Sequence, residues 1–317
     1  MEFGLHIADF TWNTGPTELG PALARHVRNA EAAGIQRITV MDHFWQLPGI
    51  GPVEHEMLEA YATLGFLVAH TEKALLHTLV TGVIYREPAL LAKTVTTLNV
   101  LSGGRVGLGI GAAWNEEESA GLGFEFPPVA ERFRRLEEQI QICLQMWSDS
   151  EEPYEGDTYR LGRTLNSPQS ITRPHPYLMI GGSGERKTLA TVARYADAWN
   201  SGGDVERLRH KDEVLRRWCD EVGRDESEIE RTAQGGVPII RDSVEEAMKV
   251  AAAMAGRNHG WKGPRDGPFG PPELVVERWA PYLDLGFEHI YVDCPAPFDH
   301  ETLERLAREV KPMLDAR

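Results

Sequence analysis

Short apolar runs alternate along this chain with longer segments that have helical spacing. In residues 19–33 apolar side chains recur every three or four positions, and Gly34 follows before the largely β-branched run 38–41. Glycine directly after the last periodic residue is typical of a helix C-terminus. The same order of helix, glycine and strand recurs in residues 88–110 and 274–292. The pattern therefore predicts repeated αβ units, which build parallel sheets.

Eight short apolar runs are strand candidates, and each is followed by a segment with helical character. They lie near residues 3–8, 37–42, 75–81, 105–111, 177–181, 197–200, 232–240 and 289–293. Eight parallel strands with right-handed crossovers favour a closed (β/α)8 TIM barrel. A doubly wound open sheet is the structural alternative.

The length of 317 residues suits one barrel with insertions, so we expect a single domain over residues 1–317. A long helix is predicted for residues 129–147. The following insertion, about 149–176, contains a polar, turn-rich stretch suited to a small hairpin. A second irregular loop, about 256–272, is rich in glycine and proline and is expected to lie over one face.

Composition excludes several classes of partner. No apolar run reaches eighteen residues, so no membrane span is expected, and the first residues lack the pattern of an export signal. Three widely separated cysteines favour a reducing cytoplasm. The formal net charge of -15 disfavours nucleic acid as a partner. No metal-ligand spacing such as H-E-x-x-H occurs, so we expect no metal site.

If the chain is a barrel, reactive groups follow the C-terminal ends of its strands. Asp42 and His43 come directly after the second strand candidate. A carboxylate can orient an imidazole, and imidazole titrates near neutrality, so the pair is the best candidate for acid/base chemistry. The alternative is that both residues only cap a turn.

Four of the eight tryptophans also follow strand candidates, namely Trp12, Trp45, Trp114 and Trp199. Flat, weakly polar rings around one mouth would suit an aromatic cofactor or an apolar substrate. We therefore predict that they line the substrate pocket. Ordinary capping of the barrel core is the alternative interpretation.

A glycine-rich loop follows the fifth strand candidate at Gly181-Gly182-Ser183-Gly184, and a helix is predicted to begin near Glu185. Backbone N–H groups in such a loop, together with a helix N-terminus, can bind a phosphate. A plain tight turn would explain the same residues. The small residues of 109–113, after the fourth strand candidate, would similarly allow a ligand to approach the backbone closely.

Three motifs in order resemble the bacterial luciferase-like superfamily, and within it the deazaflavin-dependent oxidoreductases. They are Asp42-His43-Phe44, the run 78–88, and residues 101–105 leading to Gly109-Ile110-Gly111. Glu131-Arg132-Phe133 and the glycine-rich loop reinforce the resemblance, which spans nearly the whole chain.

The resemblance implies a barrel with insertions, usually a homodimer, that transfers a hydride between coenzyme F420 and a small organic substrate. It also implies a non-prolyl cis peptide within Thr78-Leu79-Val80, against the back of the cofactor ring. The other implied cofactor contacts are Asp42 at the polar edge of the ring, Thr81 beside it, and Ala112, Ala113, Gly182, Ser183, Gly184 and Glu185 around the ribityl and phosphate portions. His43 would stand near the hydride-accepting carbon.

Two alternatives remain open: an FMN-dependent luciferase-like monooxygenase that uses molecular oxygen, and a non-catalytic cofactor-binding protein. The chain also departs from the deazaflavin-dependent glucose-6-phosphate dehydrogenases. Trp114 stands where that branch has an acidic glutamate, and Gly202-Gly203 lies where it has a lysine for the sugar phosphate. We therefore expect a flatter, more apolar substrate, although Glu116, Glu117 or Glu118 could still supply a carboxylate.

Overall fold

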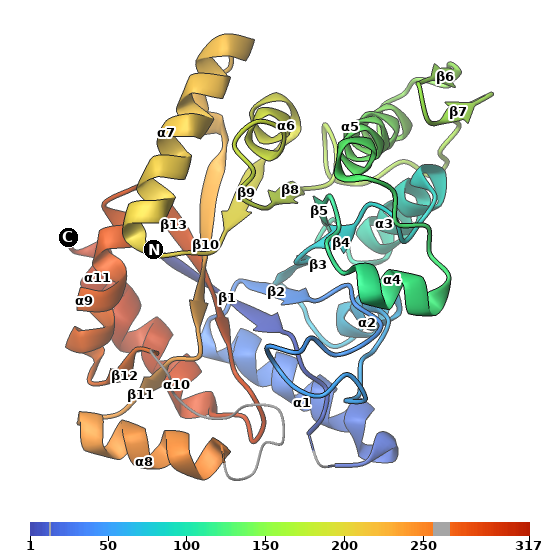
Figure 1. The fold of residues 1–317 in the computed structure, drawn as a ribbon. Helices are drawn as coiled ribbons and strands as arrows, with labels where there is room; N and C mark the ends of the chain where they lie inside the picture. Colours follow the sequence, from blue (N-terminus) through green and yellow to red (C-terminus); the bar gives the residue numbers. More distant parts are fainter. Residues whose placement is uncertain (13, 256–266) are drawn as a thin grey trace. The chain divides into compact units, whose positions relative to one another are not determined.

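The chain forms two compact units in a computed structural model that describes residues 1–12, 14–255 and 267–317 (Figure 1). Unit 1 comprises Met1–Leu75, Gly202–Arg209 and Glu230–Arg317, and unit 2 comprises Leu76–Ser201 and His210–Ile229. The single barrel domain remains a prediction. Most of the irregular loop predicted at 256–272 lies outside the described residues.

Unit 1 contains four parallel strands in the order β2-β1-β13-β10. Their side chains Leu5, Ile38 and Ile290 are buried and form the centre of its core. The strands are β1 (Glu2–Ile7), β2 (Arg37–Val40), β10 (Glu230–Gly236) and β13 (Phe287–Asp293). The helices are α1 (Pro16–Ala33), α2 (Ala60–Val68), α8 (Val244–Ala255), α9 (Pro272–Leu283), α10 (His300–Arg305), the π-helical turn η2 (Leu306–Val310) and α11 (Lys311–Asp315).

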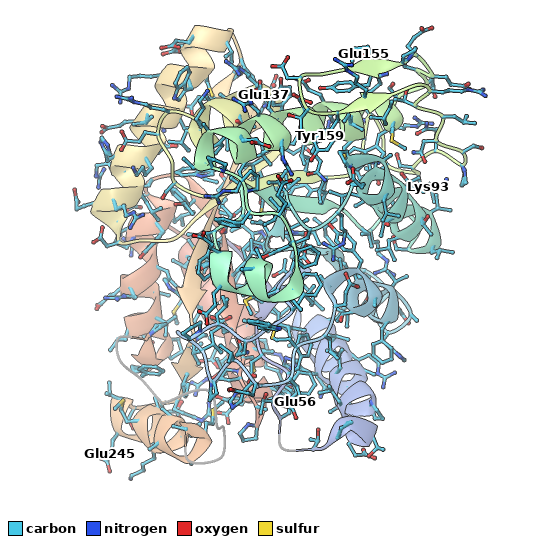
Figure 2. The ribbon with its side chains drawn as sticks, turned by 45° about the vertical axis from the view of Figure 1, so that its right-hand side comes forward. Glu56, Lys93, Glu137, Glu155, Tyr159 and Glu245 are labelled. Atoms are coloured by element: carbon cyan, nitrogen blue, oxygen red, sulfur yellow. The ribbon has the colours of Figure 1, made fainter. Side chains whose placement is uncertain are left out.

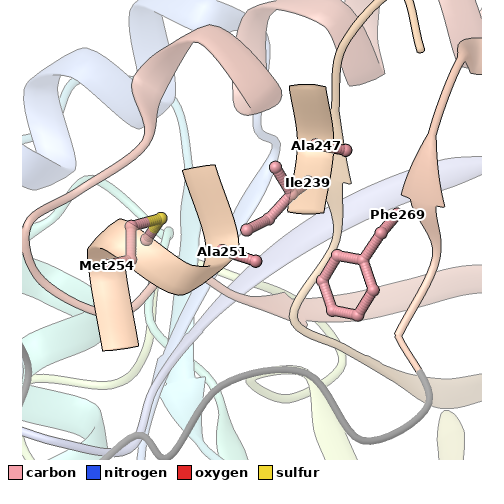
Figure 3. Close-up of a cluster of buried hydrophobic side chains, with 5 residues drawn as sticks. All are labelled: Ile239, Ala247, Ala251, Met254 and Phe269. Carbon is pink, nitrogen blue, oxygen red and sulfur yellow. The ribbon is translucent and has the colours of Figure 1, made fainter. Parts of the chain in front are cut away.

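The seventh predicted strand, 232–240, is divided in two. β10 ends at Gly236, which has φ 69°, and Pro238 then offers no N–H to a ladder. The rest of the segment is β11 (Ile239–Ile240), which pairs in parallel with β12 (Phe269–Gly270). A buried apolar cluster holds this small sheet against α8 (Figure 3): Ile239, Ala247, Ala251, Met254 and Phe269.

Unit 2 contains a second parallel array, in the order β9-β8-β5-β4. Its strands are β4 (Thr81–Gly82), β5 (Leu108–Gly111), β8 (Leu178–Gly181) and β9 (Ala198–Ser201), with β3 (Leu75–Thr78) leading into β4. Its helices are α3 (Pro88–Leu101), α4 (Glu116–Leu122), α5 (Val129–Met146) and α6 (Thr188–Tyr195), together with the 3-10 turn η1 (Glu226–Glu228); α7 (Val205–Val222) begins in unit 1 and continues into unit 2.

The insertion predicted at 149–176 contains the expected hairpin, β6 (Tyr154–Glu155) paired with β7 (Arg160–Leu161). Figure 2 shows Glu155 and Tyr159 on it. The Glu138 carboxylate of α5 accepts the backbone N–H groups of the turn at 157–159, at 2.9 to 3.1 Å. One buried carboxylate thus fixes the hairpin to the long helix.

Each of the eight predicted strand segments contains a strand, and a helix follows each, as the alternating pattern predicted. Among the described residues, no helix is both long and apolar enough to span a membrane.

Candidate active site

Asp42 and His43 lie just beyond the end of β2, in unit 1. Asp42 is 1% exposed, whereas His43 is partly exposed. The turn that carries them is held in place by Gln46, whose Nε2 donates to the carbonyl oxygen of Ala8 at 3.1 Å and to Oδ1 of Asp9 at 3.4 Å. These two hydrogen bonds therefore fix the segment after β2 to the segment after β1.

A second polar group follows β1. The Thr11 hydroxyl donates to Oε2 of Glu56 at 2.6 Å and accepts the Glu56 backbone N–H at 3.0 Å. The hydrogen bond that the Thr11 hydroxyl donates is the main reason that the pKa of Glu56 lies below its usual value. The neighbouring His55 Nδ1 is buried without a hydrogen-bond partner among the described residues.

Trp12 is 7% exposed and belongs to an aromatic cluster. Its indole N–H donates to the Asp9 carbonyl at 2.9 Å, and its ring meets Phe298 edge-on, with centroids 4.8 Å apart. Phe298 in turn stacks on His26 at 3.7 Å. This packing favours capping of the core as the role of Trp12. Trp45, in contrast, is partly exposed.

Sequence patterns did not single out His6 and Asp293, which are register partners at the ends of β1 and β13. His6 Nδ1 lies 2.9 Å from Oγ1 of Thr39. Loss of hydration lowers the pKa of His6 to about 4 and raises the pKa of Asp293 to about 7. Each is a titratable residue near the end of an otherwise largely apolar strand. That position in the sequence could have identified both residues as candidates for the site.

The predicted cis peptide is the Leu79–Val80 bond, which bends unit 2 between β3 and β4. The Thr78 hydroxyl donates to the Gly109 carbonyl at 2.7 Å, and the Thr81 hydroxyl donates to Thr78 Oγ1 at 3.0 Å. Both threonines are fully buried, and Leu79 is nearly so. Val80 is the residue of the bend that keeps exposed surface.

Glycines of β5 and β8 make room for this bend. A Cβ on Gly109 would lie 2.0 Å from the Thr78 carbonyl oxygen. A Cβ on Gly111 or on Gly181 would lie 2.9 to 3.0 Å from the methyl groups of Val80. Distances this short exclude a side chain unless the backbone moves. In the sequence, these glycines suggested close approach of a ligand. In the structure, they make room for the chain itself at Thr78 and Val80.

Ala112 and Ala113 follow β5 and are partly exposed. Ala113 has φ 59°, a left-handed conformation that non-glycine residues rarely adopt. Arg132 of α5 stabilises it, because Nη1 donates to the carbonyl oxygens of Ala112 and Ala113, and Nε donates to that of Pro127 at 3.1 Å. The Glu131-Arg132-Phe133 motif therefore has a structural role at this loop.

Trp199 supports the glycine-rich loop and does not line an open pocket. It is fully buried, and its indole N–H donates to the Gly182 carbonyl at 2.7 Å. Gly182 has φ 126°, and its N–H donates to the Asn200 carbonyl at 3.0 Å. At the end of β9, Ser201 Oγ is buried and has no hydrogen-bond partner among the described residues.

The helix after this loop begins at Thr188 and not near Glu185, because residues 185–187 form a turn. The Glu185 carboxylate accepts hydrogen bonds from Lys211 at 2.6 Å and His210 at 3.0 Å, which lower its pKa. Its carbonyl accepts the Trp218 indole N–H at 2.7 Å. The side chain of Glu185 is thus engaged with α7, whereas Ser183 is partly exposed.

Trp114 is 62% exposed. Of the three glutamates that follow it, Glu118 is fully buried and accepts a hydrogen bond from the Tyr85 hydroxyl at 2.8 Å. Glu116 and Glu117 are exposed.

Within unit 2, the bend directly precedes β4, while the 112–113 segment and the glycine-rich loop come at the ends of β5 and β8. These three strands pair in the order β4-β5-β8. Within unit 1, Asp42 and His43 follow β2, which pairs with β1, the strand that carries His6. The described residues contain no group of three or more His, Cys, Asp or Glu side chains that could hold a metal ion.

Known proteins are similar to this chain over nearly its full length. Residues 1–289 match the model of the luciferase-like monooxygenase family. An F420-dependent glucose-6-phosphate dehydrogenase of Intrasporangium calvum is 26% identical over 96% of this chain and 98% of its own length. A protein of the same name from Microbacterium testaceum is 28% identical over 91% of both chains.

Three solved structures share the fold at low identity. They are monooxygenase RslO1 of Streptomyces bottropensis (TM-score 0.81, 17% identity, 99% of both chains), the coenzyme F420-dependent tetrahydromethanopterin reductase of Methanopyrus kandleri (0.79, 18%, 99% of both) and an F420-dependent secondary alcohol dehydrogenase (0.77, 20%, 99% of this chain and 98% of that one). The fold is therefore the luciferase-like TIM barrel, and the chain belongs to the luciferase-like monooxygenase family.

Proposed function

We propose that this protein is an oxidoreductase that transfers a hydride between coenzyme F420 and a small organic substrate. The observation that carries the proposal is the run of small residues directly after the paired strands β5 and β8, namely Ala112, Ala113 and Gly182-Ser183-Gly184. Their small side chains would let a ligand approach the backbone closely. The near full-length similarity to F420-dependent dehydrogenases selects the deazaflavin among the cofactors such a surface could accept.

The residues present fit this cofactor. Ala112, Ala113, Gly182, Ser183 and Gly184 would hold the ribityl and phosphate portions. The buried Ser201 hydroxyl at the end of the neighbouring strand has no hydrogen-bond partner in the described part of the chain and offers a further polar contact. The bend Thr78-Leu79-Val80-Thr81 would support the ring, with Val80 as its exposed surface. The cofactor, when bound, supplies a two-electron hydride carrier.

Unit 1 supplies the acid/base groups in this proposal. His43 is partly exposed and would donate a proton to the substrate or hold it in position, and the buried Asp42 precedes it and would also contact the polar edge of the ring. Asp293 is a second candidate proton donor, because a carboxyl group with a pKa of about 7 is partly protonated at neutral pH.

A flat, apolar substrate is favoured over a sugar phosphate. Trp114, at the position of the acidic glutamate in the glucose-6-phosphate dehydrogenases, is exposed, and Trp45 is partly exposed. These two tryptophans are the better candidates for contact with substrate. The burial of Trp12 and Trp199 supports structural roles for them.

A homodimer in a reducing cytoplasm completes the proposal. The family resemblance supports the dimer, and the free thiols of Cys143, Cys219 and Cys294 fit a reducing compartment. Light scattering on the purified protein should give twice the chain mass of 35.4 kDa; a monomeric mass would contradict the dimer.

A titration tests the cofactor. The purified protein should change the fluorescence of coenzyme F420 on binding and should bind FMN much more weakly. The opposite preference would overturn the proposal.

The opposite preference would favour the second candidate, an FMN-dependent monooxygenase. The type II Baeyer-Villiger monooxygenase of Pseudomonas putida, solved with FMN, has a TM-score of 0.79 at 16% identity. Oxygen uptake that depends on reduced FMN would support this candidate. Binding without turnover across a panel of alcohols, imines and enones would indicate a non-catalytic cofactor-binding protein.

A further inference from the structure

Glu118, on the short helix α4, has a fully buried side chain. Its Oε2 accepts a hydrogen bond from the hydroxyl of Tyr85, which is itself buried, at 2.8 Å. Burial of a carboxyl group and a hydroxyl costs free energy that their hydrogen bond offsets only in part, and two apolar side chains of similar shape would avoid this cost. The pair is therefore better explained by what it holds in place than by the stability it adds.

Tyr85 belongs to the segment that follows the bend at Leu79–Val80. Its ring packs directly against Gly82, where an added Cβ would lie 2.6 Å from a ring carbon. Its backbone N–H donates to the Gly82 carbonyl at 3.1 Å, and the N–H of Val83 donates to the carbonyl of Gly111 at 3.0 Å. The Tyr85 side chain is thus fixed relative to the ends of β4 and β5.

Trp114 lies four residues before Glu118, at the start of α4. Asn115 caps this helix, because its Oδ1 accepts the Glu118 N–H at 3.3 Å and its carbonyl accepts the Ser119 hydroxyl at 2.7 Å. Trp114 directly precedes the cap, and its ring is largely exposed. The position of Trp114 therefore depends strongly on where the first turn of α4 lies.

We propose that Glu118 is a positioning residue for substrate binding. Through Tyr85 it fixes α4, and with it Trp114, to the segment that follows the bend. This inference rests on the proposed function, in which Trp114 contacts the substrate and the bend supports the cofactor ring. Loss of the hydrogen bond leaves the reacting atoms unchanged but lets α4 move, so it raises KM and leaves kcat nearly unchanged.

A purely local role for Glu118 makes a different prediction. Asn115 and Glu118 have the spacing of a helix capping box, in which the glutamate serves only the first turn of its own helix. Glutamine can replace glutamate in such a box, and Tyr85 has no part in it. The variant Tyr85→Phe therefore removes the proposed link and leaves the cap intact.

Fluorine NMR of protein labelled with 5-fluorotryptophan tests the link without cofactor or substrate. The variant Trp114→Phe identifies the Trp114 resonance. This resonance should shift or split in Tyr85→Phe, but it should stay close to wild type in Glu118→Gln, whose amide oxygen can still accept the Tyr85 hydroxyl. Tyr195→Phe is the matched control, since the Tyr195 hydroxyl donates to Oε1 of Glu137 at 3.2 Å in the same unit. An unchanged Trp114 resonance in Tyr85→Phe, or an equal change in the control, would overturn the proposal.

Steady-state kinetics with coenzyme F420 measures the consequence for substrate binding. Tyr85→Phe should raise KM about tenfold and change kcat by less than about twofold, as expected for the loss of one hydrogen bond to a carboxyl group. Glu118→Gln should keep KM near that of wild type. An unchanged KM in Tyr85→Phe would overturn the role in substrate binding. If the wild-type protein turns over no substrate with coenzyme F420, the proposed function fails, while the NMR result still decides whether Glu118 positions Trp114.

Discussion

The strand ends of the two units differ in what they present. In unit 2, the chain directly after β5 and β8 consists of glycine, alanine and serine, and its shape comes from backbone conformations such as φ 59° at Ala113 and φ 126° at Gly182. In unit 1, the strand ends carry titratable side chains, with His6 on β1, Asp42 and His43 after β2, and Asp293 on β13.

Under the proposed function, this difference predicts a division of work. A backbone surface binds a ligand through shape and N–H groups and contributes no proton transfer. Titratable side chains transfer protons, and this role tolerates modest changes in the shape of the surrounding backbone. Substitutions in unit 2 should therefore change cofactor affinity and stability, whereas substitutions in unit 1 should change turnover and its pH dependence. The following predictions test that contrast, from the largest expected effect to the smallest.

The variant His43→Ala should lower turnover by about 10²- to 10⁴-fold, the usual contribution of a general acid or base. Its affinity for the deazaflavin should change by less than about threefold, which corresponds to under 1 kcal/mol. Steady-state kinetics and fluorescence titration measure the two quantities. An unchanged turnover would remove His43 from the mechanism.

The variant Gly109→Ala should lower the free energy of unfolding by about 3 kcal/mol or more, because the new Cβ would lie 2.0 Å from the Thr78 carbonyl oxygen. Urea denaturation measures the loss. Gly162→Ala is the matched control in the same unit, since no atom lies within 4 Å of its added Cβ. Equal stability of the two variants would show that the bend at Leu79–Val80 does not depend on that contact.

Asp293 and His6 should shift stability in opposite directions as pH changes. The pKa of Asp293 is raised from 3.8 to about 7, so the folded state holds the extra proton and stability falls as pH rises between these values. The pKa of His6 is lowered from 6.5 to about 4, so stability rises with pH in that range.

The variant Asp293→Asn should therefore lose the fall in stability that Asp293 causes as pH rises. Relative to wild type, its free energy of unfolding should increase between pH 4 and pH 7 by on the order of 2 kcal/mol. His6→Gln should change the slope with the opposite sign. Denaturation at several pH values measures both slopes, and parallel curves for variant and wild type would contradict the shifted pKa of Asp293.

The variant Arg132→Lys should cost about 1 kcal/mol of stability, because lysine keeps the charge but cannot reach the Ala112, Ala113 and Pro127 carbonyls together. Cofactor affinity should fall with it, since Ala113 loses support for its left-handed conformation. Arg160→Lys, on the exposed hairpin, is the control. Weaker binding in the control alone would refute this role.

Much of the fold was predictable because its information is local. Helical periodicity, glycine after helices and β-branched runs depend on neighbours a few residues apart, and they located all eight strand segments. Two boundaries were wrong for equally local reasons. Gly236 and Pro238 divide the seventh strand, and the turn at 185–187 delays α6 until Thr188.

By itself the sequence determined the order of the αβ units, the family motifs and the loops made of small residues, because these follow from short-range spacing. Only the tertiary structure decided which side chains lose water and which meet. It pairs His6 with Asp293, residues near opposite ends of the chain, and it buries Trp199 beneath the glycine-rich loop. It also places cationic side chains from α5 and from the turn before α6 around one pocket. Burial and long-range register depend on the whole packed chain, so no local pattern encodes them.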